Sequence, residues 1–147
     1  MKASILFISI LAIVISCQKP SDDEEKTKQQ IIETLENETR YFCERNLKKW
    51  QDQWSHESFT SKMYAGEAKF EELVGWDEIN QFTVRHIKEN PKPLAIPQVN
   101  IEFDIHLFDN TAFVFYAKEV DGHLVRETRF MVKENRQWKI ARMQTIY

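Results

Sequence analysis

Hydrophobic and polar positions alternate along the last third of the chain, residues 99–147. The alternation falls into four runs, which cover residues 101–107, 112–120, 124–133 and 138–146. Short polar breaks separate the runs, at Asp109 and Asn110, at Asp121 and Gly122, and at Glu134 and Asn135. Alternating runs with short breaks of this kind are typical of an antiparallel meander. We therefore predict four strands joined by three tight turns.

The tight turns fix the register of these strands, because strand side chains have a period of two and each turn sets which residues pair. Counting outward from the turns places Glu127 opposite Tyr116 on one side and opposite Arg142 on the other. The same count predicts a polar cluster on one otherwise apolar face of the sheet, made of Tyr116, Lys118, Glu127, Arg129 and Arg142.

The opposite face of the predicted sheet has an apolar centre, made of Phe113, Phe115, Phe130, Val132, Ala141 and Met143. A sheet with one face in water would alternate more cleanly between apolar and polar residues. We therefore expect helices on the face with the polar cluster and a second subunit on the other face.

A helical period replaces the strand period in the first half of the chain. Apolar residues recur every three or four positions over residues 26–54, and Asn46 predicts an N-cap at which a second short helix, residues 47–54, begins. The period returns over residues 75–90, until Pro91 stops the helix. Between these helices, Met63 and Tyr64 indicate only a short edge strand.

The beginning of the chain predicts an export signal rather than a domain. Residues 1–16 contain Lys2 followed by an apolar stretch too short to span a membrane. The stretch ends at Ser16 and Cys17, which resembles the lipobox of bacterial lipoproteins, in which the cysteine becomes lipid-modified. The alternative is an ordinary cleaved signal with a chance cysteine. Residues 17–25 are acidic and predict a solvated tether, leaving residues 26–147 as one domain.

The order of residues after Cys17 bears on where the protein is located. Gln18 and Lys19 followed by acidic residues resemble the export tag that sends some lipoproteins of Bacteroidetes-type bacteria to the outer surface. We expect a lipid-anchored protein of the cell envelope, at the outer membrane. Whether it is displayed on the surface stays open.

Composition narrows the function classes. The chain has 23 acidic and 20 basic residues, a net charge of -3, so a nucleic-acid surface is not expected. Cys43 is the one thiol besides Cys17. We expect it to be a small, buried, apolar side chain on a helix. The histidines show no metal-ligand spacing, and no cofactor motif is present, so neither a metal nor a cofactor is expected.

Four short segments together resemble the NTF2-like superfamily over residues 26–147. They are Asn46-Leu47-Lys48-Lys49-Trp50, Gly75-Trp76-Asp77-Glu78-Ile79, Glu127-Thr128-Arg129 and Trp138-Lys139-Ile140. The resemblance implies an α+β cone, in which three N-terminal helices fill the concave side of a bent antiparallel sheet of about 4–6 strands. The SnoaL-like, DUF4440-type and kinase association-domain branches are the most similar.

The resemblance to the kinase association domain implies that Arg129 and Lys118 point into a pocket. The family often has histidines on its last strand, and this chain has Arg142 and Gln144 at the same positions. This difference weakens the case for any chemistry that needs an imidazole there. With the polar cluster and the tryptophans, we predict a site for a small, anionic organic ligand, lined by Arg129, Lys118, Arg142, Tyr116, Trp50, Trp54 and Trp138.

A purely structural role for the same residues stays open. Glu127 would then pair with Arg142, Tyr116 would hydrogen-bond Glu127, and a helix carboxylate would pair with Arg129. A third interpretation is a SnoaL-like isomerase, dehydratase or cyclase that transfers protons through Glu127 or His86 with Tyr116. An Arg142 partner would depress the pKa of Glu127 and make it a poor base, so binding without catalysis is favoured.

Self-association is also predicted. An apolar patch on the convex sheet face would be larger than monomers usually expose, so we expect a homodimer through Phe113, Phe115, Phe130 and Met143. Dimerisation is compatible with a ligand site, and it could also be the whole role of the domain.

Overall fold

The computed structural model describes residues 21–147, apart from residues 68, 98–100 and 121. The described chain contains three helices and six strands: α1 (Asp22–Cys43), α2 (Leu47–Gln51), β1 (Ser61–Ala65), β2 (Phe70–Val74), α3 (Trp76–Glu89), β3 (Asp104–Phe108), β4 (Thr111–Val120), β5 (His123–Glu134) and β6 (Gln137–Ile146). None of the helices among these residues is both long enough and apolar enough to cross a membrane.

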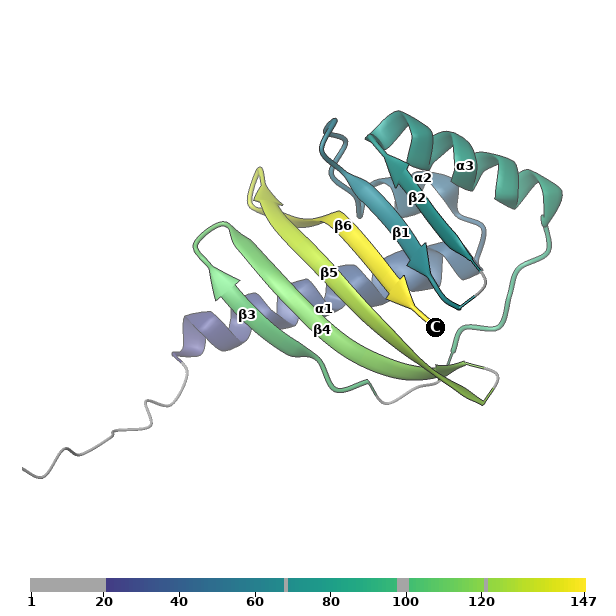
Figure 1. Ribbon diagram of the computed structural model, residues 1–147. Coiled ribbons are helices and arrows are strands. Elements are labelled where there is room, and N and C mark those ends of the chain that lie inside the picture. Colours follow the sequence, from purple (N-terminus) through teal and green to yellow (C-terminus); the bar gives the residue numbers. More distant parts are fainter. Residues whose placement is uncertain (1–20, 68, 98–100, 121) are drawn as a thin grey trace, which may run out of the picture.

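The six strands form one sheet in the order β2-β1-β6-β5-β4-β3. All neighbours are antiparallel except β1 and β6, which run parallel. Helix α1 packs along β6, whereas α3 contacts β1 and β2. Figure 1 shows α1 behind the strands, while the front of β3, β4 and β5 carries no helix. The predicted α+β cone with helices on one side of a bent sheet is confirmed.

Helix α1 begins earlier than the apolar period predicts. The Ser21 side chain accepts a hydrogen bond from the backbone N–H of Glu24, and four acidic residues follow in the first turn. Negative side chains are favourable there because the helix N-terminus carries partial positive charge. The end of the predicted acidic tether is therefore helical. Residues 17–20 of the tether, with Cys17, and the predicted signal lie outside the described residues.

The two later helices start where the sequence predicts. The Asn46 side chain caps α2 by accepting from the backbone N–H of Lys49. Helix α2 ends at Gln51 rather than continuing to Trp54, which instead forms a parallel bridge with Ile140 of β6. Gly75 precedes α3 with a φ of 89°, a conformation that glycine adopts without strain.

The segment with the weakest sequence signal forms the β1–β2 hairpin. β2 is the sheet edge, and β1 lies inside the sheet between β2 and β6, so the predicted edge strand is an interior one. The alternation expected of a strand is inverted at two positions of this hairpin. Lys62 is buried, whereas Phe70 is 68% exposed.

The predicted register is confirmed for the first two turns of the meander and wrong at the third. Tyr116 pairs with Glu127. At the third turn, Asn135 and Arg136 have φ values of 49° and 67°, so the loop lies one residue later than predicted. A bulge between Phe130 and Met131 then shifts the remaining pairs by one more residue.

The bulge turns two predicted residues to the opposite faces, because a one-residue slip reverses every side chain. Arg142 pairs with Glu72 at 3.3 Å outside the cone, so its predicted pairing with Glu127 is wrong. Met143 is buried in the hydrophobic core rather than on the outer face, and Ala141 is buried as well.

Candidate functional site

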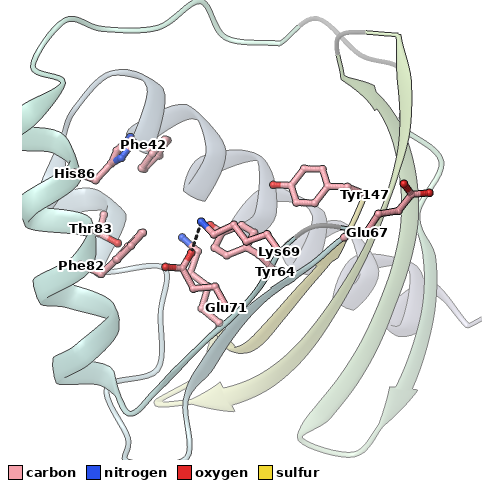
Figure 2. Close-up of a pocket in the computed structure, with 11 residues that line it drawn as sticks. Phe42, Tyr64, Glu67, Lys69, Glu71, Phe82, Thr83, His86 and Tyr147 are labelled. Carbon is pink, nitrogen blue, oxygen red and sulfur yellow. Dashed lines mark ion pairs between the residues drawn. The ribbon is translucent and has the colours of Figure 1, made fainter.

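A large hollow lies between α3 and the β1–β2 hairpin. It has a volume of about 600 Å³. Figure 2 shows Phe82, Thr83 and His86 of α3 on one side, with Tyr64 and Tyr147 across from them. We call this hollow the α3 cavity. Its wall combines aromatic rings with the charged side chains of Lys62, Glu67, Lys69 and Glu71.

A second hollow of about 240 Å³, the inner cavity, adjoins the α3 cavity. Its polar wall residues include Glu38 from α1, Lys118 from β4, Glu127 and Arg129 from β5, and Thr145 from β6. The two cavities share four wall residues, Phe42, Lys62, Tyr64 and Tyr147. They therefore meet at these side chains.

Glu127 is the centre of the polar cluster. Lys118 Nζ lies 2.9 Å from its Oε1, and Arg129 Nη1 and Thr145 Oγ1 both donate to Oε2. Burial alone would raise the pKa of Glu127, but the charges of Arg129 and Lys118 outweigh burial and hold the pKa below its ordinary value. Glu127 is therefore ionised and fully engaged at neutral pH.

Arg129 is held on two sides. Its side chain is buried, and the guanidinium lies 5.6 Å from the centre of the Tyr116 ring. Burial raises the pKa of the Tyr116 hydroxyl, although the positive charge of Arg129 opposes this. Arg129 Nε is buried and has no hydrogen-bond partner among the described residues. One donor of the guanidinium is thus unused.

Lys62 is the residue of the site that sequence reasoning missed. It is 5% exposed, and its Nζ has no ion pair or hydrogen bond within the described part of the chain. The Nζ lies 5.5 to 6.0 Å from the centres of four aromatic rings, those of Phe42, Trp50, Trp54 and Tyr64. Burial lowers the pKa of Lys62, although the negative charge of Glu38 opposes the shift. The one signal in the sequence was that Lys62 and Tyr64 occupy the same face of a short strand.

The predicted site residues do not share one cavity. Glu127, Arg129 and Lys118 line the inner cavity. Tyr116 contacts Arg129 but borders a different hollow beside α1.

The predicted tryptophans are core residues. Trp50 and Trp54 are buried beneath Lys62, and Trp50 Nε1 donates to Glu38 Oε1 at 2.8 Å. Trp138 is buried near Lys133, away from both cavities.

The predicted acid–base residues do not converge on one cavity. His86 borders the α3 cavity and stacks on Phe42, with 5.7 Å between ring centres. Glu127 borders only the inner cavity. Within the described ranges, no three His, Cys, Asp or Glu side chains gather as a metal site would require.

Comparison with known proteins identifies the fold. No protein family matches the chain by its sequence profile, and no curated protein matches it. Solved structures do match. An NTF2-like protein of unknown function from Shewanella oneidensis is 16% identical, with a TM-score of 0.59 over 82% of this chain and 99% of that one.

Two further structures have provisional enzyme assignments. A Parabacteroides distasonis protein, assigned provisionally as a ketosteroid isomerase, is 13% identical, with a TM-score of 0.59 over 88% of this chain and 93% of that one. A Streptomyces avermitilis protein, a provisional dehydratase of the NTF2-like family, is 11% identical, with a TM-score of 0.62 over 83% and 96% of the two chains. At these identities the similarity establishes the fold alone, and the chain has the NTF2-like fold.

Proposed function

We propose that this protein is a lipid-anchored binding domain that holds a small organic molecule in the α3 cavity. The observation that carries the proposal is a hollow of about 600 Å³ whose surface is mostly apolar, with aromatic rings and four charged side chains in its wall. Ligand pockets in proteins usually have volumes of roughly 300–1,000 Å³ and this kind of lining.

The polar groups of the cavity suggest the chemistry of the ligand. Among the described residues, Thr83 Oγ1 is buried without a hydrogen-bond partner, and Lys62 Nζ lies within ion-pair distance of no carboxylate. Both residues line the α3 cavity. Buried polar groups normally find a partner, because an unpaired one costs about 1–3 kcal/mol. A flat apolar ligand that carries a carboxylate would bring two oxygen acceptors and a negative charge to this wall.

Fewer cations are available to an anionic ligand than the sequence predicts. Lys118 and Arg129 already form ion pairs with Glu127. Arg142 pairs with Glu72 outside the cone. Among the described lysines and arginines that line the two cavities, Lys62 is the one that has no carboxylate within ion-pair distance.

Binding without catalysis is the function that we favour. A general base must be able to take up a proton near neutral pH. The lowered pKa of Glu127 and its three partners make it unsuited to that role. His86, the other candidate base, faces a different cavity from Glu127.

The binding proposal is tested by filling the cavity. Anilinonaphthalene sulfonate, a flat anionic dye, should bind the protein with increased fluorescence. His86→Trp should weaken its binding at least about tenfold, because the larger ring occupies the space between α3 and Tyr64. The control is Val84→Trp, an exposed position on the same helix. Equal dye affinity for both variants would contradict the α3 cavity as the site.

The lipid anchor is proposed from the sequence around Cys17. Cells expressing the full chain should incorporate an alkyne-labelled fatty acid into the protein, and Cys17→Ser should abolish the label. Cys43→Ser is the matched control, because Cys43 is a buried thiol in α1. Persistent labelling of Cys17→Ser would refute lipidation at this position.

A further inference from the structure

We propose that the α3 cavity takes a small carbonyl compound and that Lys62 Nζ holds it as a reversible imine. The inference rests on the proposed function, since it names the ligand class of the same cavity. It starts from the position of Lys62 in the wall where the α3 cavity and the inner cavity meet.

The surroundings of Lys62 are those of a reactive amine rather than of a structural ion pair. Structural buried lysines are normally paired with a carboxylate. Here Glu127 is engaged by Lys118 and Arg129, and Glu38 accepts a hydrogen bond from Trp50. Neither carboxylate lies within ion-pair distance of Lys62.

Removal of Lys62 from water favours its uncharged amine. Desolvation penalises the charged form of a lysine, and a desolvated lysine is the usual nucleophile in imine formation. The lowered pKa of Lys62 agrees with this geometry. At neutral pH, a larger fraction of Lys62 than of an exposed lysine is therefore uncharged and able to attack.

Imine formation between Lys62 and a carbonyl compound releases one water molecule as its only by-product. The lone pair of Nζ attacks the carbonyl carbon and forms a C–N bond. Two protons from the nitrogen end up on the carbonyl oxygen, which leaves as water while the C=N bond forms. His86 and the Tyr64 and Tyr147 hydroxyls line the same cavity and could relay these protons. No oxidant or reductant is needed.

Reductive trapping tests the inference on the unaltered protein. Folded protein is mixed with para-carboxybenzaldehyde, reduced with sodium borohydride, digested and analysed by mass spectrometry. Lys62 should carry the reduced adduct several-fold more often than Lys69, because burial leaves more of Lys62 as the free amine. Lys69 is a matched control because it lines the same cavity but is exposed and lies 3.1 Å from Glu71.

Two variants and a second readout separate the outcomes. Lys62→Arg should remove the dominant adduct, whereas Lys69→Arg should keep it. Modification spread evenly over exposed lysines such as Lys48 and Lys88 would overturn the inference, and this result does not depend on how any variant folds.

Displacement of anilinonaphthalene sulfonate by para-carboxybenzaldehyde is measured in parallel. Displacement without an adduct would make Lys62 a charged partner of the carboxylate, so the imine would be refuted while the binding function stands. Neither displacement nor adduct would overturn the carbonyl ligand, whereas the binding function is overturned only if the dye itself fails to bind the α3 cavity.

Discussion

At the scale of single residues, the inner cavity is governed by one carboxylate with three partners. Glu127 is buried and contacts Lys118, Arg129 and Thr145. A buried ion pair adds little net stability compared with an apolar pair, but removing one member leaves the other buried and uncompensated. The cluster therefore constrains the fold of β4, β5 and β6 whether or not a ligand binds beside it.

This argument predicts the effect of Glu127→Gln. The substitution should lower the free energy of unfolding by about 3–5 kcal/mol, because Arg129 loses its buried counter-charge. Urea unfolding at pH 7 measures the change. Glu119→Gln, at an exposed position of β4, should change it by less than about 0.5 kcal/mol. A Glu127→Gln protein as stable as the wild type would show that the pairs contribute nothing.

The same carboxylate predicts a pH dependence. The pKa of Glu127 is lower in the folded chain than in the unfolded chain, so the unfolded state binds more protons and stability rises with pH. This contribution is complete above the unfolded pKa of about 4.3 and is lost as the pH falls through the folded pKa. Between pH 7 and pH 3, the free energy of unfolding should therefore fall less steeply with decreasing pH for Glu127→Gln than for the wild type. Urea unfolding at a series of pH values measures this difference.

At the scale of elements, the strand pairing is predictable from the sequence only where the turn residues are identified correctly. The count from Asp109 and Asn110 and from Asp121 and Gly122 gave the observed pairing of β3, β4 and β5. The polar cluster of Tyr116, Lys118, Glu127 and Arg129 could be predicted because it depends on these turns alone.

The third turn and the bulge after it could not be predicted from alternation. Asn135 and Arg136 both adopt positive φ, and a single extra residue then reverses the faces of Arg142 and Met143. Lys62 was missed for a different reason. A lysine on the inner side of a strand contradicts the pattern by which strands are recognised, and polar residues break such patterns most often at functional sites.

The third turn itself is a testable element. Two-residue turns with positive φ at both positions prefer glycine second, because other residues are strained there. Arg136→Gly should raise the free energy of unfolding by up to about 1 kcal/mol. Gln137→Gly should instead lower it by about 0.5–1 kcal/mol, since Gln137 begins β6 in extended conformation. Thermal unfolding of both variants measures the difference, and a loss of stability in Arg136→Gly would contradict the proposed strain.

At the scale of the whole molecule, the two faces of the sheet have different surroundings. The helices and both cavities lie on one face, whereas Figure 1 shows the other face of β3, β4 and β5 without a covering helix. On that face Phe113 packs against Phe130 with 5.0 Å between ring centres, and Phe108 and Phe115 lie beside Phe113. Phe108, Phe113 and Phe115 are at least 40% exposed. We call these four residues the outer phenylalanine patch.

We propose that a second copy of the chain covers the outer phenylalanine patch through a two-fold axis. A two-fold contact needs only one self-complementary surface, and contiguous exposed aromatic rings are uncommon on monomers. Met143, which the sequence placed in this contact, takes no part because it is buried in the core. The contact leaves the α3 cavity open, since the cavity lies on the opposite face of the sheet.

Phe113→Thr tests the dimer, because threonine keeps the strand propensity while removing the central ring of the patch. Light scattering coupled to size-exclusion chromatography should give the mass of a dimer for the soluble wild-type domain and of a monomer for Phe113→Thr. Leu124→Thr is the matched control, since Leu124 is exposed on the same face at the far end of β5. A wild-type domain that elutes as a monomer at all concentrations would exclude the contact. If Leu124→Thr also became a monomer, the interface would have to extend along β5 beyond the outer phenylalanine patch.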